Sequence, residues 1–215
     1  MKTIRKIRTQ RNNQSKNNTI AGLIIFVKNP VLGKCKTRLA ASIGKEDALK
    51  VYINLLNHTQ KVSQSLNCNR YLFYDTEIQK NDMWSNEHFI KSVQSDGDLG
   101  NRMSSAFQTV LTMENKAVII GSDCPEINQE TVNEAFMRLD SHDVVIGPTY
   151  DGGYYLIGMR AYHEELFNNI KWSSENVYRS TIEAIKTKGL SHFALHKMHD
   201  LDYKEDLDRF PIFMV

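Results

Sequence analysis

The sequence predicts an α/β fold in three layers, with helices on both faces of a mostly parallel sheet. The first observation is a set of continuous apolar runs, such as AGLIIFV at residues 21–27, which are typical of strands buried on both faces. The second is that segments with helical spacing of apolar residues alternate with these runs. The third is the short link inside residues 142–159, which joins two strand patterns and predicts an antiparallel addition to the sheet.

Each element follows from its local pattern. Strands are expected where apolar, β-branched or aromatic residues run together, which in chain order gives residues 21–28, 70–75, 88–94, 116–123, 142–148, 153–159 and 191–198. Helices are expected where apolar residues recur every three or four positions, which gives residues 45–66, 98–113, 128–139 and 173–189, with another beginning near Thr37. Asp98 and Asn128 stand where N-caps are expected, and Gly189 is placed to close the last of these helices.

The net charge of +2 combines two unlike regions. Residues 1–20 carry six basic and no acidic side chains, whereas the rest of the chain carries 21 basic and 25 acidic ones. We expect residues 1–20 to be a disordered basic extension and residues 21–215 to be the folded domain. A mildly acidic domain argues against broad nucleic-acid binding, and no apolar run reaches the roughly 18 residues of a membrane span.

Three cysteines, Cys35, Cys68 and Cys124, are widely spaced in the sequence. They form no C-x-x-C pair, so neither a zinc cluster nor a disulfide framework is indicated. A reducing compartment, the cytoplasm, fits this pattern. The sequence gives no indication of the oligomeric state.

A basic loop follows the first predicted strand, with the sequence KNPVLGKCKTRL at residues 28–39. Gly33 permits backbone conformations closed to other residues. Positive charge beside the start of a helix comes from Lys34, Lys36 and Arg38, and Lys28 is a further candidate for phosphate binding. These features predict a binding site for the phosphates of a nucleotide. The G-x-x-x-x-G-K-[ST] pattern is absent, and a solvated basic turn is the alternative interpretation.

An acid at the end of the fourth strand is the candidate metal ligand. In VIIGSDCPEI, Asp123 leaves the strand at the sheet edge where α/β proteins bind ligands. Mg²⁺ or Mn²⁺ needs only one or two protein carboxylates when phosphates supply other ligands, and Asp202 is the expected second one. Asp200 and Asp202 alternate, so either could face the site. The alternatives are a helix cap for Asp123 and a solvated acidic turn for Asp202.

Two further motifs are candidates for binding the substrates. In GPTYDGGYYLIG, Asp151 could act as a base or bind an acceptor, and Gly152 and Gly153 leave room for a ligand. Tyr154 would line the acceptor side, since Tyr155 points to the opposite face and only one of the two should line a pocket. A tight hairpin is the alternative interpretation of this Asp-Gly segment. Arg102, on the first turn of a predicted helix, could reach a phosphate or sugar, or be a surface arginine.

These motifs, with GDLGNRM, the W-S-S at Trp172 and the closing LDYKEDL, resemble a family of bacterial GT-A-like proteins. Its members, long filed as a domain of unknown function, are now assigned as glycosyltransferases, some linked to arsenosugar biosynthesis. They are relatives of the phospholactate and molybdenum-cofactor guanylyltransferases. The resemblance covers about residues 22–207. It implies a nucleotide-diphospho-sugar transferase (GT-A) fold, a metal-binding role for Asp123, a nucleotide-phosphate loop at Lys36 and Arg38, and an acceptor loop at Asp151 to Gly153.

The expected activity is a metal-dependent transfer from a nucleotide-activated donor. We expect Asp123 and Asp202 to hold Mg²⁺ or Mn²⁺ on the diphosphate of a nucleotide sugar, and Asp151 to accept the proton of a small-molecule acceptor. The chain departs from the D-x-D pattern of GT-A glycosyltransferases because Asp123 is followed by Cys124 and Pro125. Nucleotidyl transfer from an NTP and a non-catalytic nucleotide-binding module therefore stay open as alternatives.

Overall fold

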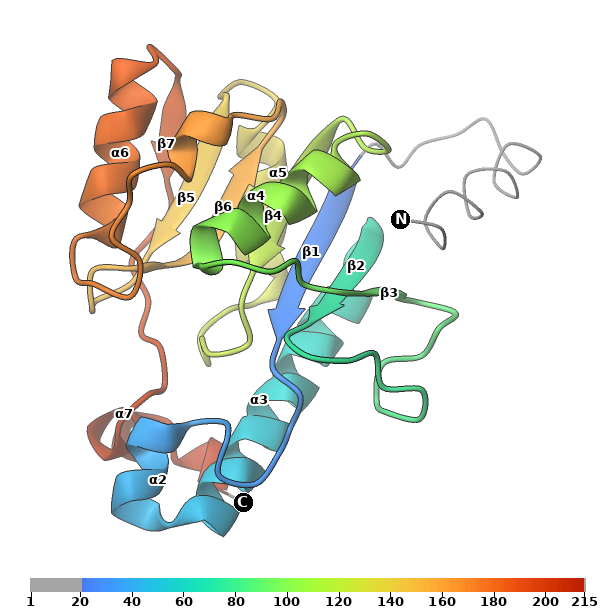
Figure 1. Ribbon diagram of the computed structural model, residues 1–215, viewed down its shortest axis with the longest axis vertical. Helices are drawn as coiled ribbons and strands as arrows, with labels where there is room; N and C mark the ends of the chain where they lie inside the picture. Colours follow the sequence, from blue (N-terminus) through green and yellow to red (C-terminus); the bar gives the residue numbers. More distant parts are fainter. Residues whose placement is uncertain (1–20, 215) are drawn as a thin grey trace.

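The computed structural model describes residues 21–214, which are built around one seven-stranded sheet (Figure 1). The strand order is β3–β2–β1–β4–β6–β5–β7. The strands are β1 (Ala21–Val27), β2 (Asn69–Tyr74), β3 (Ile90–Val93), β4 (Lys116–Ile120), β5 (Val144–Pro148), β6 (Tyr154–Met159) and β7 (His192–Ala194). The extension predicted at residues 1–20 lies outside the described residues.

The sheet is parallel apart from one strand. β1 runs parallel to both β2 and β4, β2 to β3, and β5 to β7. β6 is antiparallel to both of its neighbours, β4 and β5, so the short link before it produces the antiparallel addition that the sequence predicts. The mostly parallel α/β fold is thereby confirmed.

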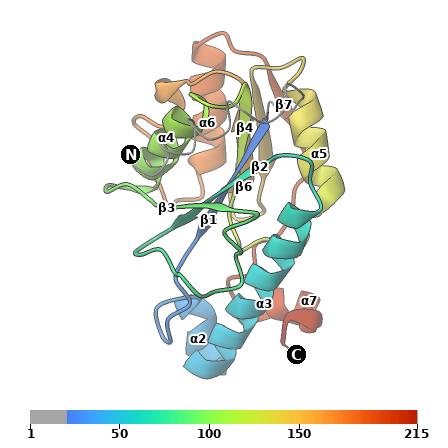
Figure 2. The same ribbon diagram turned by 90° about the vertical axis from the view of Figure 1, so that its right-hand side faces the viewer.

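Helices cover the two faces of the sheet, and Figure 2 shows α4 and α6 on one side with α3 and α5 on the other. The helices are α2 (Thr37–Ile43), α3 (Lys45–Gln64), α4 (Leu99–Val110), α5 (Gln129–Arg138), α6 (Val177–Thr187) and α7 (Lys204–Arg209), with 3-10 turns η1 (Glu164–Leu166) and η2 (Pro211–Met214). Successive residues of β1 face opposite layers: Leu23 and Ile25 pack with α3 and α5, and Ile24 packs with α4. The three-layer prediction is confirmed.

A third apolar cluster joins α2, α3 and α7 below the carboxyl end of β1, where the arrowhead of β1 points in Figure 1. Leu39 of α2 and Leu201 and Leu207 near the C-terminus are buried in it. This packing brings the basic turn that follows β1 against the acidic C-terminal segment, although more than 160 residues separate them in sequence. The functional side chains described below meet at this junction.

Several predicted element ends are confirmed. Asp98 caps α4 by accepting the backbone N–H of Asn101 at 2.9 Å, and Asn128 caps α5 by accepting that of Thr131 at 2.9 Å. Gly189 follows α6 with φ of 65°. No helix among residues 21–214 is long and apolar enough to cross a membrane.

Two predicted elements fall furthest short of their patterns. The helix expected at residues 173–189 begins only at Val177, because Ser173 adopts a left-handed φ of 60° and residues 173–176 form turns. The strand expected at residues 191–198 ends at Ala194. Beyond it the chain keeps contact with β5 through single hydrogen bonds, such as the one from the Met198 N–H to the Pro148 carbonyl oxygen at 3.1 Å.

Candidate active site

Asp123 lies just beyond β4, where the chain leaves the sheet through Gly121 and Ser122. Its backbone carbonyl accepts the N–H of Leu201 at 2.9 Å, which ties the strand end to the C-terminal segment. Its side chain is 46% exposed, so it remains accessible to a ligand. The alternative interpretation as a helix cap is wrong, because Asn128 supplies the cap of α5.

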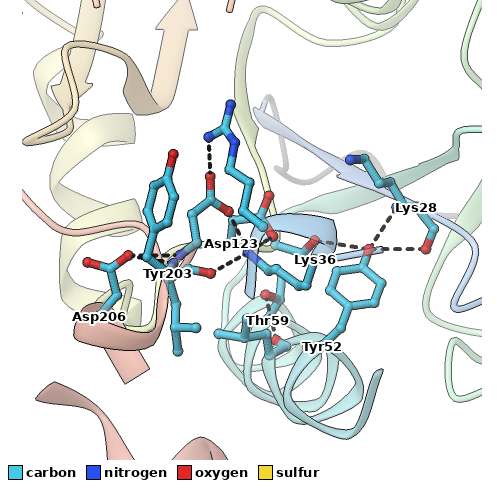
Figure 3. A network of polar contacts seen from close by, with 12 residues as sticks. Lys28, Lys36, Tyr52, Thr59, Asp123, Tyr203 and Asp206 are labelled. Carbon is cyan, nitrogen blue, oxygen red and sulfur yellow. Dashed lines mark hydrogen bonds and ion pairs between the residues drawn. The ribbon is translucent and has the colours of Figure 1, made fainter. Parts of the chain in front are cut away.

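Lys36 meets Asp123 at the centre of the site (Figure 3). Its ammonium Nζ lies 2.5 Å from Asp123 Oδ1 and 3.2 Å from Asp202 Oδ1, and it donates to the Leu201 carbonyl oxygen at 2.7 Å. The side chain is only 3% exposed. Burial alone would lower the pKa of this ammonium, but the two carboxylates outweigh it and raise the pKa, so Lys36 is charged at neutral pH.

The backbone of Lys36 is strained at this position. Its φ of 49° lies in the left-handed region, which a residue other than glycine adopts at a cost of about 1 kcal/mol or more. The Lys36 side chain points inward just before α2 begins, while Arg38 two residues later points to the surface. The acid after β4 and the basic turn are therefore in direct contact.

The segment after β7 supplies the second acid. Asp202 accepts from Arg38 Nη1 at 3.0 Å as well as from Lys36, and the Arg38 guanidinium lies 5.6 Å from the centre of the Tyr203 ring. Asp206 fixes this segment, because its Oδ2 accepts the backbone N–H groups of Asp202 and Tyr203 at 3.0 and 2.9 Å. Two cations and a helix cap thus hold Asp202 in place.

Three cavities meet at Asp123. A central cavity of about 370 Å³ lies over the carboxyl ends of β1 and β4, an acidic cavity of about 560 Å³ lies beside β6 and the C-terminal segment, and a basic cavity of about 240 Å³ lies at the turn before α2. Asp123 lines all three. No other described residue lines more than two of them, so the three cavities adjoin at Asp123.

The basic cavity contains most of the predicted phosphate-binding residues. Lys28, Lys36 and Arg38 line it, and Lys28 lines the central cavity as well. The Tyr52 hydroxyl positions Lys28 by accepting its backbone N–H at 2.8 Å and donating to its carbonyl oxygen at 3.1 Å. Gly33 lines none of the three cavities, and its φ of 72° shows that its role is to let the loop turn.

Arg102 lines the central cavity from the first turn of α4. Its Nε donates to the Gly97 carbonyl oxygen at 3.0 Å, and its Nη1 lies 3.5 Å from Gln94 Oε1. Tyr154 and Tyr155 both line this cavity, so the expectation that only one of them could do so is wrong. The cavity extends around the end of β6, where residues on both faces of the strand reach it.

The Asp-Gly segment between β5 and β6 is both a turn and part of a cavity wall. Asp151 Oδ1 accepts the Thr149 hydroxyl at 2.5 Å and the Gly153 N–H at 3.0 Å, while the residue lines the acidic cavity. Gly152 has φ of 92°, and a Cβ there would lie 1.9 Å from the Glu175 carbonyl oxygen. Gly153 and Tyr154 also line the acidic cavity, and Tyr154 separates it from the central one.

Sequence reasoning missed part of this wall. The turns at residues 172–175 close the acidic cavity against two glycines: Glu175 covers Gly152, and the Trp172 indole covers Gly100, where a Cβ would lie 2.3 Å from the indole Nε1. The W-S-S tripeptide was the available signal. The packing of Trp172 on Gly100 and of Glu175 on Gly152 depends on tertiary contacts that no local pattern indicates.

Asp200, which the sequence offers as the alternative to Asp202, lines both the central and the acidic cavities with Asp123. Burial first, and then the charges of Asp123 and Asp151, raise the pKa of its carboxyl group to about 8. Asp200 accepts no hydrogen bond from the described residues, whereas Asp202 is held by Lys36 and Arg38. The alternating acids in DLD were the signal in the sequence.

The arrangement fits a divalent cation. Among the described residues no three His, Cys, Asp or Glu side chains form a complete metal cage. Asp123 and Asp200 nevertheless supply two carboxyl groups to the same two cavities, and Mg²⁺ or Mn²⁺ commonly takes its remaining ligands from phosphate and water. Burial first, and then the neighbouring carboxylates, raise the pKa of Asp200, and a bound cation would oppose both effects by favouring the charged carboxylate.

Comparisons with known proteins agree with this architecture. The profile of a family described as "Uncharacterized protein conserved in bacteria (DUF2064)" matches residues 58–174. A provisionally assigned nucleotide-diphospho-sugar transferase from Desulfovibrio desulfuricans G20 is 29% identical, with a TM-score of 0.82 over 90% of this chain and 87% of that one. The fold is therefore of the nucleotide-diphospho-sugar transferase type, as expected. A comparison with curated proteins gives no match.

More distant structures share the fold alone. The 4-diphosphocytidyl-2C-methyl-D-erythritol synthase of Anaerococcus prevotii DSM 20548 is 10% identical, with a TM-score of 0.57 over 92% of this chain and 99% of that one. A manganese complex of Rv0371C from Mycobacterium tuberculosis H37Rv is 11% identical, with a TM-score of 0.50 over 89% and 97% of the two chains. Proteins with this fold thus include a 4-diphosphocytidyl-2C-methyl-D-erythritol synthase and one found in complex with manganese.

Proposed function

The chain belongs to the DUF2064 family of bacterial proteins, and we propose that it is a metal-dependent glycosyltransferase that uses a nucleotide sugar and a small-molecule acceptor. The observation that carries the proposal is the position of Asp123, which lines a central, a basic and an acidic cavity at once. Glycosyl transfer needs room for three groups: the nucleoside of the donor, the diphosphate of the donor, and the acceptor that takes the sugar. The three cavities match that division.

The donor would lie across the central and basic cavities. The nucleoside fits the 370 Å³ central cavity, with Arg102 at its wall, and the diphosphate extends past Asp123 towards Lys28, Lys36 and Arg38. Fixed positive charges beside a leaving diphosphate stabilise the transition state more than the ground state, because negative charge accumulates there as the sugar leaves. The ion pairs made by the buried Lys36 ammonium would keep it and Asp123 preorganised.

A divalent cation on Asp123 and Asp200 would supply further stabilisation of the charge that develops on the diphosphate. Asp200 takes the place that the sequence assigns to Asp202, because Asp202 is engaged by Lys36 and Arg38. Asp202 would then position the two cations. The metal and its ligands are part of the proposal.

The acceptor would enter the acidic cavity and present a hydroxyl group near Asp151. The oxygen of the acceptor hydroxyl forms a bond to the anomeric carbon of the donor sugar. The bond from that carbon to the diphosphate oxygen breaks, and its electron pair stays on the diphosphate. The acceptor proton passes to Asp151, whose Oδ2 accepts no hydrogen bond from the described residues. The products are a glycoside and a nucleoside diphosphate.

The three thiols are free, in keeping with a reducing cytoplasm as the site of the reaction.

The assay for this proposal measures the leaving group. The full-length protein is incubated with a panel of nucleotide sugars and NTPs, with Mg²⁺ or Mn²⁺ and candidate acceptors. We expect release of a nucleoside diphosphate from one nucleotide sugar. Release of pyrophosphate from an NTP would instead assign nucleotidyl transfer to a phosphorylated acceptor. Metal-dependent nucleotide binding with neither product would assign a nucleotide-binding module.

A further inference from the structure

The acidic cavity indicates the charge of the acceptor. We propose that it receives a hydroxyl compound that carries a positively charged amine, such as an amino sugar or an aminocyclitol. This inference rests on the proposed function and concerns the same site. Six carboxyl groups line the cavity, whereas Arg38 is the one arginine or lysine among the described residues in its lining. The six are Asp123, Asp151, Glu175, Asp200, Asp202 and Asp206.

Only two of these six acids have a cationic partner. Lys36 pairs with Asp123 and Asp202, and Arg38 pairs again with Asp202. Asp151 and Asp206 are held only by uncharged hydroxyl or backbone N–H groups. A cation on Asp123 would balance the charge at one end of the cavity and leave the wall at Asp151 and Glu175 negative.

Glu175 is the acid best placed to interact with an acceptor. It is exposed on the turn that covers Gly152, and its side chain accepts no hydrogen bond or ion pair from residues 21–214. The turn packs its main chain, not its carboxylate, against the protein. Glu175 therefore contributes charge to the cavity without being needed to hold the cavity together.

Aromatic rings in the same cavity provide independent support for a positively charged ligand. Tyr150 and Tyr203 line it with exposed fractions of 58% and 51%. Each ring already attracts a cation: Lys197 Nζ lies 4.8 Å from the centre of Tyr150, and the Arg38 guanidinium lies 5.6 Å from that of Tyr203. Tyr150 also stacks on His199, with ring centres 4.1 Å apart, so Tyr203 is the ring among these carboxylates that can attract an ammonium group of a ligand through cation–π contact.

This charge distribution selects between acceptor classes. A cavity lined by one sign of charge concentrates ligands of the opposite sign and repels those of the same sign. A phosphorylated acceptor would bring two negative charges against Asp151 and Glu175, so the cavity disfavours the acceptor that nucleotidyl transfer requires. The acceptor wall is thus matched to an amine, and the basic cavity on the other side of Asp123 to the donor phosphates.

The test uses ring compounds that differ in charge. One series is 2-deoxystreptamine, myo-inositol and inositol 1-phosphate, and the other is glucosamine, glucose and glucose 6-phosphate. Binding to the full-length protein is measured by saturation-transfer NMR with Mg²⁺ and a nucleoside diphosphate, whose own binding is first established by calorimetry. The variants are Glu175→Gln and Glu175→Lys. Glu130→Lys is the matched control, because Glu130 is exposed on α5 and lines none of the three cavities.

We expect the amines to bind about fivefold more tightly than the uncharged rings in at least one series, and the phosphates to bind most weakly. Glu175→Lys should weaken amine binding about threefold to fivefold without changing the uncharged rings, and Glu175→Gln should have a smaller effect. The preference should shrink as NaCl is raised towards about 0.5 M. Glu130→Lys should match the wild type.

The inference would be overturned by any of four results: equal affinities for the amines and the uncharged rings, tighter binding of the phosphorylated rings, no binding of either amine, or an amine preference that Glu175→Lys leaves unchanged. The nucleotide measurement separates this result from a failure of the proposed function. If no nucleoside diphosphate binds in the presence of metal, the proposed function is wrong. If nucleotide binds as proposed but the charge order is flat or reversed, only the acceptor inference is wrong.

Discussion

Replacing Asp123 by Asn should abolish activity while leaving the fold nearly as stable. The change removes one carboxylate from the Lys36 ammonium, but Asp202 Oδ1 at 3.2 Å and the Leu201 carbonyl oxygen at 2.7 Å remain. Because the Asp123 side chain is 46% exposed, water screens its ion pair and the asparagine oxygen can still accept from Lys36. We expect a loss of about 1–2 kcal/mol in the free energy of unfolding.

That loss corresponds to a fall of about 3–6 °C in the melting temperature for a domain of this size. The rate of nucleoside diphosphate release should fall about 100-fold or more, since a charge that stabilises the transition state is lost at the junction of the three cavities. The gain in nucleotide affinity that Mn²⁺ produces should disappear. Thermal unfolding, product release and calorimetry with and without Mn²⁺ measure these three effects.

Asp140→Asn is the matched control, because Asp140 also forms an ion pair with a lysine but lies outside the cavities. Its Oδ1 is 2.6 Å from Lys116 Nζ, and its side chain is 69% exposed. This variant should keep the wild-type rate and metal dependence. The reasoning fails if Asp123→Asn turns over within about threefold of the wild type. It also fails if its melting temperature falls by more than about 10 °C, since a structural role would then account for lost activity.

Three further outcomes test individual contacts. Gly152→Ala should lower the free energy of unfolding in urea by at least about 2 kcal/mol more than Gly44→Ala does. Both glycines have φ near 90°, but only at Gly152 would the new Cβ meet another atom within 4 Å. Equal losses of stability in the two variants would refute the contact with Glu175. Tyr52→Phe should lower the free energy of unfolding by about 1–2 kcal/mol and raise the KM for the donor, because the backbone N–H of Lys28 loses its hydrogen-bond acceptor. An unchanged KM would count against the role of Tyr52 in positioning Lys28. Hydrogen bonds from Ser191 and then Arg160 lower the pKa of Asp143 from 3.8 to about 2, so its carboxylate stabilises the fold above pH 4 and ceases to do so as pH falls through about 2. The stability advantage of wild type over Asp143→Asn, about 1 kcal/mol at pH 7 by urea titration, should therefore shrink between pH 4 and 2, and a constant difference would contradict it.

Local patterns determined the layers and the position of the main acid. Strands such as β1 and β4 are apolar on both faces because helices cover both sides of the sheet, and that burial is written in consecutive residues. The caps at Asp98 and Asn128 are equally local, since each side chain bonds to a backbone N–H three residues ahead. Asp123 follows from the same logic, because a polar residue after a buried strand must lie at the carboxyl edge of the sheet.

The sequence by itself therefore determined the α/β alternation, the antiparallel addition and the acid at the end of β4. Only the tertiary structure decided that Lys36 pairs with Asp123 and Asp202, that Asp200 faces the cavities, and that Glu175 lies over Gly152. These contacts join segments from about 20 to more than 160 residues apart in the sequence. Spacing along a strand or helix specifies which residues share a face, but not which distant segment packs against that face, because the order of strands and the docking of α2 and α7 depend on the packing of the whole chain.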